Sequence, residues 1–348
     1  MIDWSVAERV AGFVAGAPPD SPPAAAGRMA ELAHDAERRV LAYTGMQLSS
    51  ALPMPEALNR QQWIEANLRS MRPIIEPLTA RVGANLGALA APARLLTGLV
   101  MAAQVGALTG YLAGRVLGQY EIALLDSEAT PRLLMVSPNL AEAAEKLRAD
   151  PEELVDWVAF HEVTHAVQFS SVPWLRDHLA GLLRELLGSL EVRLDGSRAM
   201  KLPGLDDLRG IVEALREGDL ISLTIGRERR ALVDQVQAAM ALIEGHAEHV
   251  MDAVGAEVLP SQAALREAME RRRDGRAGPL RLLDRLLGME LKLRQYRDGK
   301  RFVDRVVETG GMGALNRAWS APGALPTLAE LADPTAWMAR TAVPFVTK

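Results

Sequence analysis

Residues 161–165 read His161-Glu162-Val163-Thr164-His165, with Trp157 four residues before the first histidine and Phe169 four residues after the second. A helix turns by about 100° per residue, so this spacing places both imidazoles and both aromatic rings on one face. A helix start precedes them, because Asp150 can accept hydrogen bonds from free amides and Pro151 suits the first helical position. We therefore expect a helix that runs to about Phe169 and carries two histidines one turn apart.

Two imidazoles at this spacing, with a carboxylate between them, are typical of zinc hydrolases. His161 and His165 would each give the metal a ring nitrogen. Glu162 would take a proton from a water that zinc has made more acidic, with a pKa of about 7. The alternative is that both histidines are ordinary core or surface groups. The motif thus predicts one zinc ion and Glu162 as a general base.

A catalytic zinc ion usually has three protein ligands and keeps a fourth position for water. A third histidine six residues after His165, with a glycine midway, would complete one common arrangement, but the chain has Gln168 and Ser171 at these places. His178 lies beyond Pro173 and cannot be placed from the sequence. Potential ligands crowd together again at 240–252, on a helix expected over residues 227–254.

Glu244 lies at the margin of the apolar face of that helix, so we expect it to be the third ligand. Glu248 follows one turn later and would accept a hydrogen bond from the far nitrogen of a ligating histidine. The alternative is that Glu248 belongs to a row of acidic side chains on a solvent-exposed face of the helix. His246 and His249 are expected to point toward the polar side. Gly245, inside a strong helical pattern, indicates close approach of another backbone or a ligand.

With these motifs the chain resembles the zincin-like proteins of the gluzincin type, which carry His-Glu-x-x-His on one helix and Glu-x-x-x-acid on another. More closely, it is similar to a family of mainly actinobacterial zincin-like hydrolases that are labelled as associated with deazaflavin coenzyme biosynthesis. The resemblance implies a zincin core and a metal site, and peptidase activity through the wider clan. Glu248 stands where many gluzincins have Asp. Most of the chain is covered, through residues 3–7, 42–45, 59–67, 118–120, 161–169, 244–252 and 292–303.

The amino-acid composition excludes several kinds of functional site and favours one fold class. The 348 residues contain no cysteine, which excludes disulfides, thiolate zinc sites and cysteine nucleophiles. Hydrophobic residues make up 49% but aromatic residues only 4%, which favours helices packed through small side chains. The net charge of −5 argues against a nucleic-acid partner. Basic clusters at 227–230, 271–276 and 292–301 are interleaved with acids, so they indicate solvated helix faces or, alternatively, a groove for an acidic substrate.

We expect a mainly α (α+β), zincin-like fold, with a helical bundle and a small β-hairpin or sheet next to the His-Glu-x-x-His helix. One unit spans 1–348. It comprises an N-terminal helical region (1–118), the sheet and metal helix (119–170), and a C-terminal helical region that carries the third ligand (171–348). Short strands are expected at Gln119–Leu125 and Leu133–Ser137, as a plain hairpin or as an edge that pairs with an extended substrate.

Further helices are expected at 24–46, 55–82 (with Asn59 as a cap), 175–200, 205–218 and 280–297. Trp319 and Trp337 would anchor a C-terminal tail on the surface. Residues 95–114 carry no charge and are long enough to cross a bilayer. Glycines at four-residue spacing would allow close helix contacts in a membrane. Because Gly, Thr and Gln make the run only moderately apolar, however, we favour a buried helix packed by small residues. Residues 1–4 lack a basic start and an apolar run, so a cytoplasmic location is expected.

The predicted reaction is zinc-dependent hydrolysis of an amide, with a peptide as the expected substrate. Glu162 would return its proton to the leaving nitrogen. A donor to the tetrahedral oxyanion is also expected, with Tyr296 and His249 as candidates. The alternative is a catalytically idle, zincin-like metal-binding or scaffold protein. The sequence does not indicate an oligomeric state.

Overall fold

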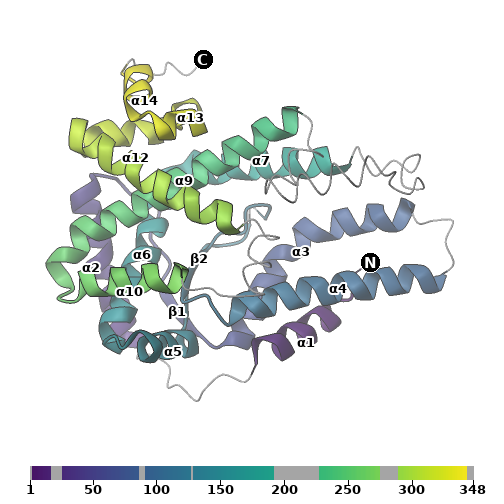
Figure 1. The fold of residues 1–348 in the computed structure, drawn as a ribbon. Coiled ribbons are helices and arrows are strands. Elements are labelled where there is room, and N and C mark those ends of the chain that lie inside the picture. The colour runs from purple at the N-terminus through teal and green to yellow at the C-terminus, as the bar shows by residue number, and fades with distance from the viewer. Residues whose placement is uncertain are drawn as a thin grey trace.

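In the computed structural model, helices surround a small sheet (Figure 1), which confirms the expected fold class. The structure describes residues 2–16, 26–85, 91–126, 128–191, 227–274 and 289–342. The helices are α1 (Trp4–Ala15), α2 (Ala26–Thr44), α3 (Arg60–Asn85), α4 (Ala91–Ala113), α5 (Ser137–Leu147), α6 (Pro151–Ser171), α7 (Pro173–Glu191), α9 (Arg227–Val258), α10 (Gln262–Asp274), α12 (Met289–Leu315), α13 (Leu328–Ala332) and α14 (Pro334–Arg340). The expected helix 205–218 lies outside the described residues.

The sheet contains β1 (Pro55–Leu58), β2 (Gly118–Glu121) and β3 (Arg132–Val136) in the order β1-β3-β2. β2 is antiparallel to β3, so the expected hairpin is confirmed, whereas β1 is parallel to β3. The expectation of helix from residue 55 was wrong, because a four-residue strand is too short to show a period of its own. Asn59 caps α3 as expected, since its side chain and that of Gln62 each accept from the other's backbone amide.

α6 is the central helix of the molecule. The Asp150 side chain caps it by accepting from the amides of Glu152 and Glu153 at 2.8 and 3.0 Å, as expected. The helix contacts β2 and β3, and it also packs against α2, α5, α7 and α9. Most of its residues from Leu154 to Ser170 are buried, as is typical of a helix that is covered on all sides. α6 therefore offers a rigid, largely dry support for the residues of the motif.

Glycines set the spacing between two pairs of helices. A Cβ at Gly245 of α9 would lie 2.3 Å from the carbonyl carbon of Gly299 in α12, which confirms the expected close backbone approach. In the same way, Cβ atoms at Gly106 and Gly110 of α4 would lie 2.3 Å from carbonyl oxygens of α1. The crossing of α9 and α12 matters most for the site, because α9 carries Glu244.

Gly299→Ala is expected to destabilise the protein by about 1–3 kcal/mol through overpacking, despite the better helix propensity of alanine. The added Cβ would lie 1.9 Å from the Ala241 carbonyl oxygen and force α12 away from α9. Urea unfolding measures the change. Gly181→Ala in α7 is the matched control, because its Cβ would meet nothing within 4 Å. Equal stability of both variants would contradict the packing described here.

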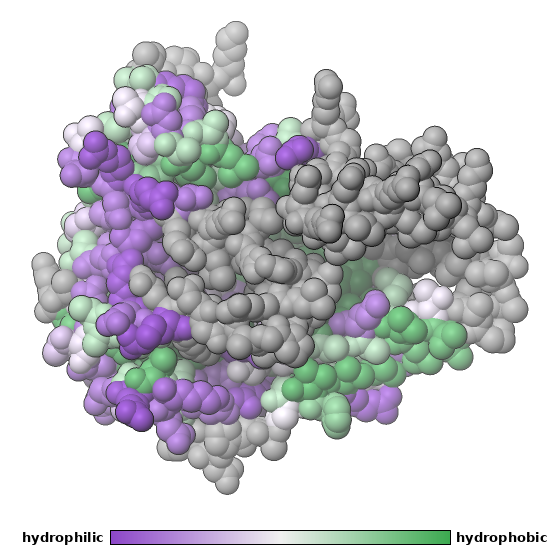
Figure 2. All heavy atoms as spheres, in the orientation of Figure 1, coloured by the Kyte–Doolittle hydropathy of each residue, from purple (hydrophilic) through white to green (hydrophobic). Residues whose placement is uncertain are grey.

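Within α4, the apolar side chains between residues 95 and 100 are largely exposed, with 67% of Leu95 and 63% of Leu96 accessible. Figure 2 shows apolar surface over α4 and α1. By length and composition Leu95–Ala113 could cross a membrane, and 33% of its apolar window is buried. The expectation of a buried helix is therefore right where the glycines meet α1 and wrong for the exposed side chains of Leu95, Leu96, Leu99 and Val100.

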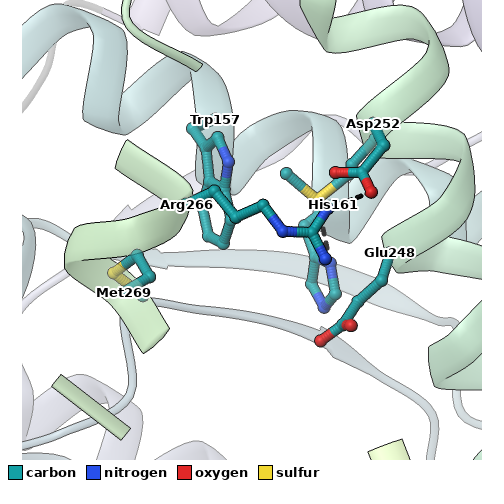
Figure 3. A pocket seen from close by; sticks show the side chains of 7 residues that line it. Trp157, His161, Glu248, Asp252, Arg266 and Met269 are labelled. Carbon is teal, nitrogen blue, oxygen red and sulfur yellow. Dashed lines mark hydrogen bonds and ion pairs between the residues drawn. The ribbon is translucent and has the colours of Figure 1, made fainter. Parts of the chain in front are cut away.

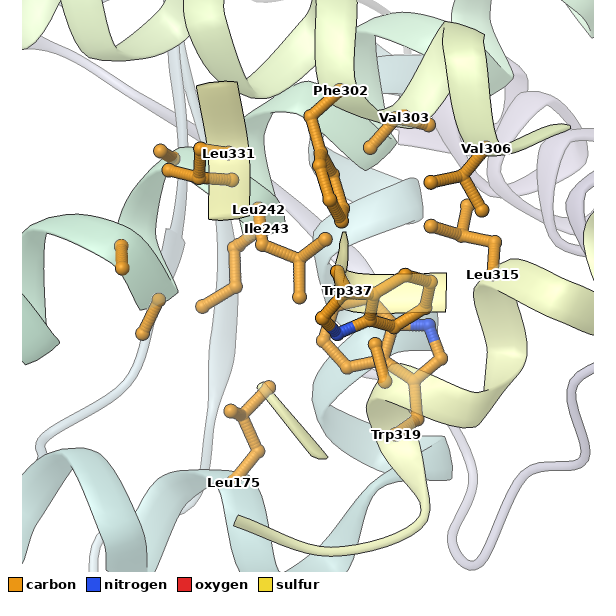
Figure 4. Packing of buried hydrophobic residues seen from close by; sticks show 14 of the residues in the cluster. Leu175, Leu242, Ile243, Phe302, Val303, Val306, Leu315, Trp319, Leu331 and Trp337 are labelled. Carbon is orange, nitrogen blue, oxygen red and sulfur yellow. The ribbon is translucent and has the colours of Figure 1, made fainter. Parts of the chain in front are cut away.

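The largest core cluster joins α9, α12 and the C-terminal helices (Figure 4). Trp337 is fully buried with its ring edge-on to Phe302, and its Nε1 donates to the Ala324 carbonyl at 2.8 Å. Trp319 lies in the same cluster, and its carbonyl accepts from Nε1 of Trp174. Both tryptophans thus anchor the C-terminal segment as expected, and the cluster holds α9 in place.

Candidate metal centre

α6 and α9 bring three potential ligands together. Nε2 of His161 and Nε2 of His165 lie 3.2 Å apart. Oε2 of Glu244 lies 3.7 Å from the first nitrogen and 3.6 Å from the second. Ligands about 2.1 Å from a tetrahedral zinc ion are separated from one another by about 3.4 Å. Two imidazoles and one carboxylate at these distances therefore fit a zinc ion, with room for a fourth ligand.

Glu162 lies beside this group and is held by the edge of the sheet. Its Oε2 accepts a hydrogen bond from the Tyr120 amide of β2 at 2.8 Å. A Cβ at Gly118 would lie 2.8 Å from Cγ of Glu162, so glycine at this position leaves room for the carboxylate. Burial raises the pKa of Glu162 to about 7, although the charge of His165 and the amide hydrogen bond oppose the rise. A buried carboxyl with this pKa is suited to proton transfer near neutral pH.

Gln168 orients His165 from one turn further along α6. Nδ1 of His165 lies 2.8 Å from Oε1 of Gln168, which leaves Nε2 facing Glu244. The side-chain nitrogen Nε2 of the buried Gln168 is 2.8 Å from the Ile243 carbonyl oxygen and 2.9 Å from Nδ1 of His246. The expectation that Glu248 would hold a ligating histidine is thus wrong for His165. Sequence reasoning missed Gln168 because it was weighed only as a mismatch to a different zinc motif.

Gln168→Leu is expected to weaken zinc binding by about 10- to 100-fold, because His165 loses the acceptor that fixes its tautomer. The change also leaves the Ile243 carbonyl without this donor. Competition with a chromophoric chelator measures the affinity. Gln168→Glu restores an acceptor and should bind zinc more tightly than the leucine variant. Affinity in Gln168→Leu equal to that of the unchanged protein would contradict the positioning role.

His246 is fully buried, so the expectation that it points toward the polar side was wrong. α9 has several packed faces, because it contacts α6, α7 and α12 as well as α2 and α10. Burial, followed by the charges of His249 and His165, lowers the pKa of His246 to about 3. His246 is therefore neutral, and it lies edge-on to the ring of Trp319.

The two candidate oxyanion donors are placed as follows. Nδ1 of His249 lies 2.7 Å from Oδ1 of Asp304, and its Nε2 lies 2.8 Å from the Tyr43 hydroxyl. Both ring nitrogens are engaged with other helices, so the structure does not support His249 as an oxyanion donor. Tyr296 lies in α12, but its side chain is outside the described residues.

A small hollow lies against the outer side of His161 (Figure 3). The Trp157 ring stacks on the His161 ring with an interplanar angle of 2°, and Nδ1 of His161 lies 3.2 Å from Sδ of Met251. Glu248 lines this hollow together with Asp252, Arg266 and Met269. Glu248 therefore lines the hollow beside His161. Met251 contacts Nδ1 of His161, the ring nitrogen that does not face Glu244.

The zinc-free site is expected to respond to pH through His165. Burial acts to lower the pKa of His165, but the facing Glu244 outweighs it and raises the pKa from 6.5 to about 9. A raised pKa means that this contribution to stability is complete below pH 6.5 and is lost as the pH rises through 9. Zinc must displace the same proton, so its affinity should rise by about tenfold per pH unit between pH 7 and 9.

Unfolding temperatures with chelator or with zinc, recorded from pH 7 to 9, measure both effects. The zinc-free protein should lose stability over this range, while the stabilisation by zinc should increase. A zinc affinity that does not change with pH would contradict the protonated state of His165.

Together, the helical architecture, the small sheet and the two-histidine, one-glutamate group define a zincin-like protein. The model of the zincin-like metallopeptidase family matches residues 2–338, and the chain belongs to this family. A crystal structure from Chloroflexus aurantiacus, described as that of a candidate hydrolase with a novel fold, superposes with a TM-score of 0.73 and 28% sequence identity. The match covers 99% of this chain and 100% of that one. No curated protein matches this chain.

Proposed function

We propose that the protein is a zinc-dependent hydrolase that cleaves an amide bond, with a peptide as its substrate. The observation that carries the proposal is the convergence of His161, His165 and Glu244, whose donor atoms lie within 4.8 Å of one another, beside the buried Glu162. These three residues would hold one zinc ion. Membership of the zincin-like metallopeptidase family and the likeness to the Chloroflexus protein support the assignment to hydrolases.

A bound zinc ion supplies a Lewis acid that polarises the carbonyl group and makes water reactive near neutral pH. Glu162 takes the proton from the attacking water on its carboxylate and delivers it to the leaving nitrogen. The Tyr120 amide and the space at Gly118 keep this carboxylate next to the ligands without adding it to them. The general base and the groups that position it thus lie on α6 and on the adjoining strand β2.

β2 provides a binding edge for an extended substrate. Among the described strands, β2 pairs only with β3, so its other side has no strand partner. The same strand carries the Tyr120 amide that contacts Glu162. An extended peptide that pairs with β2 would place its main chain beside the general base, and main-chain pairing tolerates varied side chains.

Incubation of the zinc-loaded protein with a mixture of defined peptides, with and without chelator, tests the proposal by mass spectrometry. We expect cleavage that chelator abolishes and added zinc restores. Zinc bound at full occupancy without any cleavage would contradict the proposal and would favour the alternative of an idle metal-binding or scaffold protein.

A further inference from the structure

Four large apolar side chains lie close together on the exposed side of α4. They have between 36% and 67% of their surface accessible, and they belong to Leu95, Leu96, Leu99 and Val100. At about 100° per residue, these positions fall within one half of the circumference of the helix, so they form one surface, which we call the α4 patch. Adjoining apolar side chains on a protein surface typically mark a contact with another molecule or with lipid.

The α4 patch continues the face of α4 that α1 covers further along the helix. Leu99 precedes Gly106 by seven residues, and Leu95 precedes it by eleven. Both spacings return to the same side of a helix. At Gly106 the backbone of Ala7 in α1 is so close that an added Cβ would lie 2.3 Å from its carbonyl oxygen. α1 begins at Trp4, and the apolar side chains of α4 are exposed beyond the part of the helix that α1 covers.

The size of the side chains in the α4 patch favours lipid over a further helix. Where α1 packs, α4 presents Gly106 and Gly110, small residues that let two helix backbones approach each other. The patch instead presents three leucines and one valine. Acyl chains accommodate such side chains without a matching surface, because they are fluid and as apolar as leucine itself.

The distribution of charge along the chain favours a membrane with anionic lipids. Between Glu76 and Glu121 the sequence contains no Asp or Glu, and its charged residues there are Arg81, Arg94 and Arg115. The negative net charge of the chain therefore resides entirely outside this stretch. Arg81 belongs to α3 and Arg94 to the first turn of α4. Basic residues near anionic headgroups are attracted to them, whereas acidic residues would be repelled.

The packing of α4 is compatible with a contact at the membrane surface but not with a membrane span. α4 packs against α1 and also contacts α3, and the chain then continues into β2 (Figure 1). Gly118 of β2 lies against Glu162, so the far end of α4 adjoins the metal centre. α4 rises by about 27 Å from Leu95 to Ala113. A protein bound through the α4 patch thus keeps the metal centre in the aqueous phase.

We propose that the α4 patch inserts into the interface of a membrane that carries anionic lipids, and that the protein binds the membrane surface in this way. Helices with one apolar face bind such interfaces through the apolar area that they bury and through attraction to anionic headgroups. The inference goes beyond the proposed function and does not depend on it. It assigns the uncharged run of α4 to lipid binding and leaves hydrolysis to α6, α9 and β2.

Flotation of the full-length protein with lipid vesicles tests the inference. One set of vesicles consists of phosphatidylcholine, and the other of equal parts of phosphatidylcholine and phosphatidylglycerol. We expect the protein to partition onto the mixed vesicles roughly tenfold more strongly than onto phosphatidylcholine. High salt should reduce this difference, because it screens the attraction between the arginines and the headgroups.

The double variant Leu95→Gln/Leu99→Gln should partition onto the mixed vesicles about tenfold more weakly or less. The substitutions remove much of the apolar area of the α4 patch and leave the charge of the protein unchanged. Met54→Gln is the matched control, because Met54 is an apolar side chain outside the patch that is 48% exposed. Its partitioning should equal that of the unchanged protein. Unfolding temperatures establish that each variant is folded.

The absence of cysteine from the chain allows insertion itself to be measured. A nitrobenzoxadiazole fluorophore is attached to the variant Leu96→Cys and, as a control, to Met54→Cys. With mixed vesicles, the emission of the first should shift to shorter wavelength, and a nitroxide on the acyl chains should quench it. The second should keep the emission that it has in water.

Absence of binding, equal binding to both kinds of vesicle, or full binding by Leu95→Gln/Leu99→Gln would overturn the inference. So would a fluorophore at Leu96→Cys that stays in water on bound vesicles. A dimer in analytical ultracentrifugation that the double variant abolishes, without vesicle binding, would assign the α4 patch to a second copy of this chain. None of these measurements involves zinc or a peptide, so their outcome is separate from that of the proposed hydrolysis.

Discussion

Replacing Glu162 by glutamine should abolish most of the hydrolytic activity while the protein still binds zinc. Glutamine retains the size of the side chain and an oxygen that can accept from the Tyr120 amide. It cannot take a proton from water, however, and loss of a general base typically lowers the rate by about 10²–10⁴-fold. The effect should fall on kcat, because the change removes an interaction of the transition state.

The measurement is peptide cleavage under single-turnover conditions, together with the zinc content of the same samples. Glu152→Gln serves as a control on the same helix, because 75% of the Glu152 side chain is exposed. Its activity should match that of the unchanged protein. Full activity in Glu162→Gln would contradict the assignment of the base, and a loss of zinc would show that Glu162 belongs to the ligands.

Glu244→Ala is expected to lower the affinity for zinc by more than about 100-fold, beyond the loss typical of a residue that only orients a ligand. The substitution removes the carboxylate from the only described group of three donors that converge on one point. It also removes the charge that raises the pKa of His165, so that pKa should fall. A chelator competition assay measures the first effect, and titration of the imidazole by nuclear magnetic resonance measures the second.

Glu248→Gln distinguishes the two acidic residues of α9. Nδ1 of His165 already contacts Gln168, and Nδ1 of His161 contacts Met251. We therefore expect the zinc affinity of Glu248→Gln to stay within a few-fold of that of the unchanged protein. If Glu248→Gln released zinc and Glu244→Ala retained it, the assignment of the third ligand would be wrong.

Local signals in the sequence were sufficient for α6. Its cap and its motif depend on residues within one or two turns of one another, so both can be recognised from spacing along the sequence alone. The position of Glu244 at the margin of an apolar face also followed from periodicity, and the structure places it beside both histidines. Gly245 indicated a close approach, and α12 provides it.

The polar network around the ligands could not be predicted in this way. The partners of His249 lie 55 and 206 residues away in the chain, and no spacing rule connects them. Periodicity also assumes a single buried face, whereas α9 packs against helices on several sides, so His246 was misplaced. β1 was missed because its pairing partner, β3, is more than 70 residues away.

The central claim is that one zinc ion is held by His161, His165 and Glu244. X-ray diffraction from crystals of the zinc-loaded protein, recorded on both sides of the zinc absorption edge, tests it most directly. We expect one anomalous peak about 2.0–2.2 Å from an Nε2 atom of each histidine and from a carboxylate oxygen of Glu244. Absence of a peak between these three side chains, or a zinc ion held by other residues, would contradict the account.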